Sequence, residues 1–332
     1  QKDIDLQTFD GSYDSFTSKE RVDIARAVEQ AARSRSDKVI TCTAGFSDSM
    51  YESVKVHSNG FEGSSRGTVF SAGAEATVHG EGEGRPSDWD WRTYRFRKEM
   101  VSADALGQGA VDRALAKVGQ SKMASGIYDL VIENRAASRL LSSILSPMRA
   151  SSIQQKRSFL DGKLGEKIAS EKMTMIDDPF IISGFGSRLY DGEGMATRRR
   201  VMIDKGVLKS YYVDCYYGRK LGMEPTISSP TNMVFEYGDK SLEQLVAQMK
   251  RGILVTSFIG GNSNSTTGDF SVGIIGTYVE DGKRVKPVNE MNISGNLTEV
   301  LNQLVEMGND PWVHSSWRRP SMYFRDVQFS GV

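Results

Sequence analysis

Three histidines are the first candidates for catalysis or metal binding in this chain: His57, His79 and His314. A zinc site on a helix needs two histidines one turn apart, as in H-E-x-x-H, and no two of these three have that spacing. We interpret His57 and His79, which lie in strand-like stretches, as surface or hydrogen-bonded structural residues. His314 follows Pro311-Trp312-Val313, and an imidazole in such an aromatic loop could face a groove.

The other nucleophiles and acids give weaker indications of chemistry. Cys42 and Cys215 are too few for a disulfide framework, and Cys215 has no basic neighbour before Arg219, so we expect a buried, inert thiol there. No strand is expected to lead into a G-x-S-x-G nucleophile elbow, so we expect no Ser/His/Asp triad. Asp177-Asp178-Pro179 reads as a turn, with metal binding as the alternative.

Charge and composition exclude several classes of protein. The 332 residues contain 42 Lys+Arg and 42 Asp+Glu, so the formal net charge is zero, which argues against a nucleic-acid binder and against a polybasic membrane-surface protein. No apolar run approaches the ~18–20 residues of a bilayer span. We therefore expect no direct nucleic-acid or membrane partner, and the two cysteines, read as reduced thiols, indicate a cytoplasmic protein. The chain opens at Gln1, so we also expect a missing N-terminal stretch, whose content, including any targeting segment, stays open.

The elements of the first part predict an antiparallel sheet beside two helices. Thr17-Ser18-Lys19-Glu20 is a capping box that starts one helix, and residues 102–118 have the apolar spacing of a second. Strands with one solvent-facing side are expected at 39–43, 49–57, 67–79 and 89–98. The polar run Gln120-Ser121-Lys122 places a domain boundary, which gives domains 1–122 and 123–332.

The second part is dominated by hairpins. A strand at 128–132 should precede a helix that Asn134 caps and Pro147 stops, and 260–268 reads as a polar Gly/Asn/Ser loop. Hairpins are expected at 195–213 and 270–293, with further strands at 253–259 and 321–329. The fold class is therefore α+β, with antiparallel or mixed sheets built from hairpins and flanking helices in two domains.

Four sequence blocks follow one another in the second part. They are Arg157-Ser158-Phe159-Leu160-Asp161-Gly162-Lys163-Leu164-Gly165; Asp191-Gly192-Glu193-Gly194 with Arg198-Arg199 and Gly206-Val207-Leu208; Thr267-Gly268-Asp269-Phe270-Ser271 with Val279-Glu280-Asp281-Gly282-Lys283; and Ile293-Ser294-Gly295-Asn296-Leu297 with Val305-Glu306-Met307-Gly308-Asn309-Asp310. In this order the blocks resemble the TldD/PmbA family, the so-called modulators of DNA gyrase, and residues 66–91 are compatible with the middle region of that family. Relative to the family, the N-terminal domain is expected to be largely absent.

The resemblance implies a two-part metallopeptidase that binds extended peptides by strand addition. Its TldD-type subunit carries an H-E-x-x-x-H helix and a late Cys as zinc ligands, whereas its PmbA-type subunit, also called TldE, lacks them. Here the corresponding helix offers Leu140, Leu141, Ile144 and Leu145, whose stripe we interpret as core, and residues 315–321 contain no Cys. The chain therefore resembles the PmbA/TldE type, with no catalytic or metal residues, no cofactor of its own, and zinc on a TldD-type partner.

The expected peptide site is an exposed strand edge beside Gly260-Gly261-Asn262, with Asp269 and His314 as weaker candidates for its lining. Substrates would be unfolded or flexible peptides, because main-chain pairing is largely blind to side chains. One alternative is a self-sufficient peptidase that uses Asp177, Asp178, Glu193 or His314. Another is a homodimeric peptide-binding scaffold without catalysis, in which the partner is a second copy of the chain.

Overall fold

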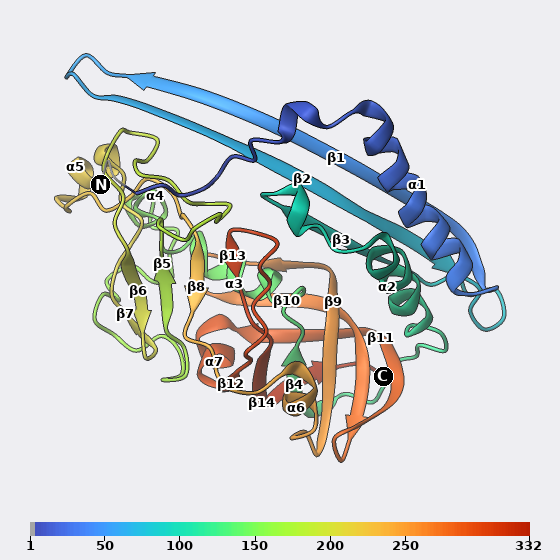
Figure 1. Ribbon diagram of the computed structural model, residues 1–332. Helices are drawn as coiled ribbons and strands as arrows, with labels where there is room; N and C mark the ends of the chain where they lie inside the picture. Colours follow the sequence, from blue (N-terminus) through green and yellow to red (C-terminus); the bar gives the residue numbers. More distant parts are fainter. Residues whose placement is uncertain (1–3) are drawn as a thin grey trace. The chain divides into compact units, whose positions relative to one another are not determined.

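The structure is a computed structural model that describes residues 4–332, and these fall into two compact units (Figure 1). The N-terminal unit contains Asp5–Gln120 and the short segment Ile182–Phe185. The C-terminal unit contains Ile4, Ser121–Ile181 and Gly186–Val332. Mixed sheets with flanking helices confirm the predicted α+β class.

The N-terminal unit is a three-stranded antiparallel sheet whose two helices pack against it. Small side chains of β2, such as Ala72 and Ala74, are fully buried in the core that the sheet shares with the helices. Gly107 lets the two helices approach closely, because a Cβ there would lie 2.4 Å from the carbonyl oxygen of Val28. The elements are η1 (Tyr13–Ser15), α1 (Ser18–Arg35), β1 (Val39–Val56), β2 (Glu62–Val78), β3 (Ser87–Tyr94), η2 (Arg97–Glu99) and α2 (Ala103–Leu115). The predicted capping box of Thr17 and Glu20 is confirmed at the start of α1.

The first two predicted strands, 39–43 and 49–57, are wrong as separate elements, because β1 runs unbroken through the residues between them. Gly45 at this point pairs with Gly73, and the ring of Trp91 fills the space where a side chain at Gly45 would lie. Because β3 pairs only with residues 70–77 of β2, the ends of β1 and β2 continue as a two-stranded ribbon. We call residues 49–69 the hairpin arm (Figure 1).

The main sheet of the C-terminal unit has the strand order β11-β10-β9-β4-β14-β12, and a pairing of β11 with β14 closes five of these strands into a barrel (Figure 1). All neighbours are antiparallel except β4 and β9. The strands are β4 (Gly126–Ile132), β9 (Arg251–Ser263), β10 (Asp269–Glu280), β11 (Lys283–Asn296), β12 (Leu304–Met307) and β14 (Met322–Ser330). The associated helices are α3 (Ser138–Leu145), α6 (Leu242–Val246) and α7 (Leu297–Asn302).

A second sheet in the same unit has the order β13-β8-β5-β6-β7. The predicted hairpin at 195–213 is shorter than expected, because the carboxylate of Asp191 accepts hydrogen bonds from the backbone N–H groups of Glu193 and Met195 and holds the chain in a loop. The elements here are α4 (Ala150–Gln154), β5 (Met175–Asp177), β6 (Arg200–Asp204), β7 (Val207–Leu208), α5 (Cys215–Leu221), β8 (Met233–Phe235) and β13 (Trp317–Arg318).

Two local predictions about the C-terminal unit are wrong. Asn134 does not cap a helix, because residues 134–137 form a turn and α3 starts only at Ser138. The Asn134 side chain instead donates a hydrogen bond to the carbonyl oxygen of Asp310, 2.6 Å away. Residues 260–263 do not belong to a loop either; they are the last residues of β9, and the loop begins at Asn264.

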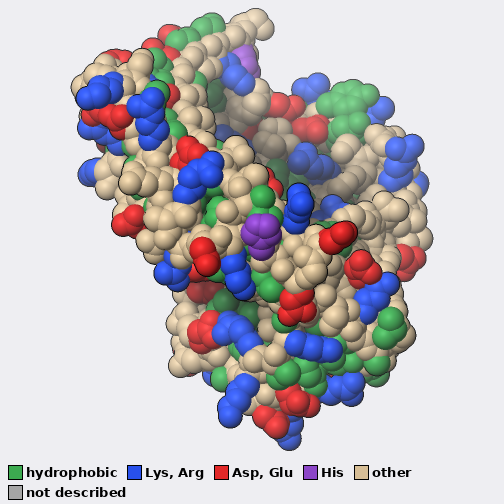
Figure 2. Space-filling model, turned by 90° about the vertical axis from the view of Figure 1, so that its right-hand side faces the viewer, with side chains coloured by type: hydrophobic (Ala, Val, Ile, Leu, Met, Phe, Trp, Pro, Cys, Tyr) green, Lys and Arg blue, Asp and Glu red, His purple; other side chains and the backbone are tan. Residues whose placement is uncertain are grey.

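The surface agrees with the balanced composition. Acidic and basic side chains are interspersed over the face shown in Figure 2, with no large patch of one sign. Within residues 4–332, no helix is both long enough and apolar enough to cross a bilayer.

Candidate peptide-binding site

The second half of β9 forms a strand edge because β9 extends beyond its neighbour β4. Only residues 129–132 of β4 pair with β9, against residues 252–255. Just beyond this ladder, the N–H of Glu133 donates to the carbonyl oxygen of Val255 at 3.0 Å. Within the described part of the chain, residues 256–263 therefore pair with β10 alone. We call these residues the β9 edge.

A β-bulge at Gly260 and Gly261 shapes this edge. Two residues of β9 stand here opposite the single residue Val272 of β10, and both glycines have positive φ, +56° and +86°. A Cβ at Gly261 would lie 2.3 Å from the carbonyl oxygen of Ser271, so the neighbouring strand requires glycine there. Gly260 has open space where a side chain would stand. Asn262 continues the strand and pairs with Ser271.

The carbonyl groups of the bulge are held by an arginine that the sequence analysis missed. Arg139, in the first turn of α3, donates from its guanidinium to the carbonyl oxygens of Gly260 at 3.2 Å and Gly261 at 3.0 Å. These carbonyls therefore face α3. Arg139 is separated from Gly260 and Gly261 by more than 120 positions in the sequence, and no local pattern links residues so far apart. The contact could therefore be recognised only from the arrangement of β4, α3 and β9.

The turn that leads into α3 is bound to the loop that carries His314. The backbone N–H of Asn134 donates to the Ser321 hydroxyl at 3.0 Å, and that hydroxyl donates to the carboxylate of Asp310 at 2.7 Å. The ring of His314 packs edge-on against Trp312, with 4.9 Å between centroids. Asp310, like Arg139, was not selected from the sequence as a site residue, and its role is to join these two segments.

The same loop holds a buried arginine close to a second one. Arg319 is 8% exposed and donates to the Ser315 hydroxyl and to the carbonyl oxygens of Trp317 and Arg135. Burial, together with the charge of Arg135, lowers the pKa of Arg319 to about 10. The Arg135 guanidinium lies 5.3 Å from the ring centroid of Trp312. The loop is therefore fixed by contacts with the turn before α3.

Asp269 lies at the start of β10, and its side chain is engaged on the β11 side of that strand. Its carboxylate accepts hydrogen bonds from the Thr267 hydroxyl at 2.7 Å and the Asn296 amide at 3.2 Å, which lower its pKa.

Of the residues expected to line the peptide site, Gly260, Gly261 and Asn262 lie next to one another in β9. Asp269 stabilises the adjacent turn, and His314 lies on the loop that the turn before α3 supports.

The acids of the self-sufficient alternative have structural partners. Asp177 is 1% exposed and accepts from the Tyr212 hydroxyl at 3.1 Å and the Thr231 N–H at 2.9 Å, and burial raises its pKa. Asp178 accepts from the N–H of Phe180. Glu193 accepts from the N–H of Cys215 at 2.8 Å. Cys215 is half-buried rather than buried as predicted, and burial followed by Glu193 raises its thiol pKa.

The side chains of α3 do not fit a zinc ion. Leu140, Leu141, Ile144 and Leu145 are all less than 9% exposed and belong to the main core of the unit, which confirms the prediction of a core stripe. Aliphatic groups offer no lone pair to a metal. Across residues 4–332, no three His, Cys, Asp or Glu side chains are grouped so that they could hold a metal ion.

The sequence matches two domains of one protein family. Residues 12–118 match the PmbA/TldA metallopeptidase central domain, and residues 125–331 match the PmbA/TldA metallopeptidase C-terminal domain. The chain is 28% identical to the metalloprotease PmbA of Escherichia coli O157:H7 over 94% of its own length and 70% of that protein. It is 29% identical to a metalloprotease PmbA homologue of Buchnera aphidicola, over 74% of its length and 55% of the relative.

Solved structures have the same fold. A protein from Bacteroides thetaiotaomicron described as a modulator of DNA gyrase superimposes with a TM-score of 0.96 and 43% identity, over 99% of this chain and 75% of that one. TldE from Thermococcus kodakarensis has a TM-score of 0.83 at 24% identity, over 97% of this chain and 76% of that one, a likeness of fold. The chain thus spans between about half and three quarters of the length of these relatives. Both domain matches and these relatives lead to one conclusion: the chain belongs to the TldD/PmbA metallopeptidase family.

Proposed function

We propose that this chain is a non-catalytic subunit of the PmbA/TldE type in a two-part cytoplasmic zinc metallopeptidase. It binds unfolded or flexible peptides at the β9 edge, and a TldD-type partner supplies the zinc. The observation that carries the proposal is the one-sided pairing of residues 256–263.

The chemistry of the β9 edge supports peptide binding. A strand without a neighbour leaves backbone N–H and C=O groups open to pairing with another chain, and natural proteins usually protect such edges with charged side chains. Residues 256–263 read Thr-Ser-Phe-Ile-Gly-Gly-Asn-Ser and carry no charge. An extended peptide added here would be held mainly by its main chain, which makes binding tolerant of sequence.

The side chains near the edge support a division of labour with a partner. Hydrolysis by a metallopeptidase needs a cation that activates water. The stripe of α3 that includes Leu141 and Ile144 is core, and residues 315–321 contain no thiol. The relatives are named metalloproteases, which supports the reaction class. We therefore assign the catalytic cation to the second subunit.

Reconstitution with metal analysis tests this division. This chain and a TldD-type chain are purified separately, zinc is measured in each by mass spectrometry, and an unstructured peptide is offered to each chain and to the mixture. We expect zinc in the TldD-type chain, cleavage by the mixture and loss of cleavage on adding a chelator. Stoichiometric zinc in this chain, or cleavage by it alone, would show a self-sufficient peptidase. Peptide binding without any association with the TldD-type chain would favour the homodimeric scaffold.

Two neighbouring proline substitutions test the β9 edge itself. Phe258 and Ile259 pair with consecutive residues of β10 between the two irregular points of the ladder. Consecutive residues of a strand direct their N–H groups to opposite sides, so one proline removes a bond to β10 and the other removes a donor from the open side. We expect one of Phe258→Pro and Ile259→Pro to lower the melting temperature strongly. The other should remain folded but lose peptide binding; undiminished binding by a folded variant would contradict the proposal.

A further inference from the structure

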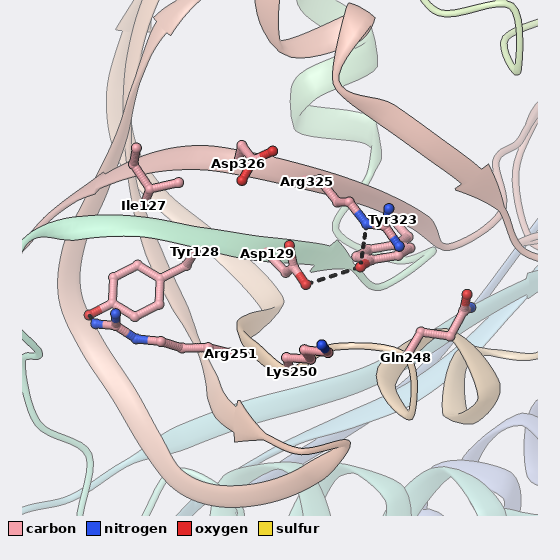
Figure 3. A pocket seen from close by; sticks show the side chains of 9 residues that line it. All are labelled: Ile127, Tyr128, Asp129, Gln248, Lys250, Arg251, Tyr323, Arg325 and Asp326. Atoms are coloured by element: carbon pink, nitrogen blue, oxygen red, sulfur yellow. Dashed lines mark hydrogen bonds between the residues drawn. The ribbon is translucent and has the colours of Figure 1, made fainter.

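A pocket lies at the end of β9 opposite to the β9 edge. It encloses about 430 Å³ between the start of β9, the strands β4 and β14 and the chain that follows α6 (Figure 3). This volume falls within the range of small-molecule sites. None of the residues assigned above to peptide binding lines this pocket.

A β-bulge directs charged side chains to this pocket. Arg325 and Asp326 of β14 together stand opposite the single residue Asp129 of β4. Asp326 adopts a positive φ of +57°, which is unfavourable for a residue other than glycine. Gln303 holds the bulge from both sides: its carbonyl oxygen accepts from the N–H of Arg325 at 3.1 Å, and its side chain donates to the carbonyl oxygen of Asp326 at 2.9 Å. Bulges of this kind re-aim side chains and are frequent beside binding sites.

Hydrogen bonds between the lining residues keep the pocket in shape. The Tyr323 hydroxyl donates to the carboxylate of Asp129 at 3.0 Å and accepts from Nε of Arg325 at 3.2 Å (Figure 3). The Arg251 guanidinium lies over the ring of Tyr128, 4.5 Å from its centroid, and donates to its hydroxyl at 3.0 Å. The site is therefore largely preorganised, which lowers the cost of binding.

The charges around the pocket select the kind of ligand. Lys250, Arg251 and Arg325 contribute three cations, and Asp129 and Asp326 contribute two carboxylates. Within the described residues, the ammonium of Lys250 makes no hydrogen bond or ion pair. A simple anion would meet two carboxylates in this space, and a simple cation would meet three positive groups. A molecule with both charges can pair with both sets.

We propose that this pocket binds a small zwitterion, namely a free α-amino acid or a dipeptide. Asp129 and Asp326 receive its ammonium group, and Lys250 and Arg325 receive its carboxylate. The site is independent of the peptide-binding function proposed for the β9 edge.

Calorimetry with blocked and unblocked dipeptides tests the ligand class. Diglycine is titrated into the folded chain, in parallel with acetyl-diglycine, diglycine amide and inorganic phosphate. We expect diglycine to bind and each blocked form to bind about tenfold or more weakly, because each lacks one charge-assisted hydrogen bond. Phosphate binding as tight as that of diglycine would overturn the proposal, and so would the absence of any diglycine binding at millimolar concentration.

Charge-neutralising variants test the residues. Asp129→Asn and Lys250→Gln should each weaken diglycine binding about tenfold or more. Lys286→Gln, at an exposed lysine of β11 outside the pocket, should leave binding unchanged. Asp326→Asn serves if Asp129→Asn fails to fold, because asparagine tolerates positive φ well. Unchanged affinity in both folded pocket variants would refute the assignment, and the folded proline variant of the β9 edge should still bind diglycine.

Discussion

Two segments of the molecule, the β9 edge and the hairpin arm, leave strand edges without a neighbouring strand, and they differ in how those edges are protected. In the arm, Glu52 stands directly opposite Arg66, and Lys55 and Glu62 add further charges. A stretch near the start of the chain covers part of the arm, since the carbonyl oxygen of Thr8 accepts from the N–H of Thr68. The β9 edge has no charged residue.

The difference indicates what each segment is for. Opposite charges across a strand pair stabilise the ribbon and discourage pairing with other chains. The arm is therefore built to stay as a two-stranded ribbon in water, although Val54 and Val56 are 67% and 69% exposed. The β9 edge carries no charged residue of its own, and Arg139 binds its carbonyl oxygens at the bulge. The stretch of β9 before the bulge therefore suits a segment that accepts a peptide strand.

The largest expected difference between the two segments is in the free energy of unfolding that is lost when a glycine is replaced by alanine. Gly60 at the tip of the arm and Gly261 in the bulge both have φ of +86°, but only Gly261 has backbone atoms within 3 Å of a would-be Cβ. We expect Gly60→Ala to lower the free energy of unfolding by about 1–2 kcal/mol. Gly261→Ala should lower it by about 3 kcal/mol or more, because strain and overlap add. Urea denaturation measures both, and equal losses would show that the bulge is not rigid.

A lysine placed on either segment tests their roles directly. Ile259 on the β9 edge is 41% exposed and Val54 on the arm is 67% exposed, so neither substitution should change stability by more than about 0.5 kcal/mol. A charge on an open edge opposes strand addition. We expect Ile259→Lys to weaken the binding of a flexible peptide about tenfold, measured by fluorescence anisotropy. Val54→Lys should have no effect, and a loss in Val54→Lys would place binding on the arm.

Removal of Arg139, which binds the bulge from α3, should have a smaller effect on stability. Arg139→Ala deletes two hydrogen bonds to the carbonyl oxygens of Gly260 and Gly261. Because this side chain is exposed to solvent, we expect a loss of only about 1 kcal/mol in the free energy of unfolding. Peptide affinity should fall as well, since the bulge is then less firmly held. A variant with unchanged stability and affinity would show that Arg139 does not hold the bulge in solution.

The smallest effect concerns the turn next to the β9 edge. Hydrogen bonds from Thr267 and Asn296 lower the pKa of Asp269 in the folded state. The stability that this carboxylate provides is therefore present above its unfolded pKa, near 3.9, and is lost as pH falls through the lower folded value. Asp269→Asn should therefore make the loss of stability with falling pH less steep below about pH 4. Identical acid titrations of the two proteins by circular dichroism would contradict this.

The parts of the fold that could be predicted from sequence are those with local causes. The capping box at Thr17 was predicted and confirmed, since both partners lie within one helical turn. The stripe of α3 was predicted as core because helical spacing places its aliphatic residues on one face. The hairpins at Asp204 and Asp281 could also be predicted, because the residues of each turn are neighbours in the sequence.

The parts that sequence reasoning missed have distant causes. Residues 260–268 resembled a polar loop because glycine and asparagine usually mark loops, but the pairing of Ile259 and Asn262 with β10 holds Gly260 and Gly261 in the strand as a bulge. Asn134 resembled a helix cap, but its amide binds Asp310, 176 positions later. Arg139 could be recognised as part of the site only after the barrel had brought α3 to β9.

Hydrogen–deuterium exchange with and without a flexible, uncharged peptide tests the central claim most directly. The account predicts slower exchange of alternate amides within residues 256–263 on adding the peptide, because only the N–H groups on the open side of β9 gain a partner. It predicts no change in residues 49–56 of the hairpin arm. Protection of the arm, or no protection of the β9 edge at saturating peptide, would contradict the account.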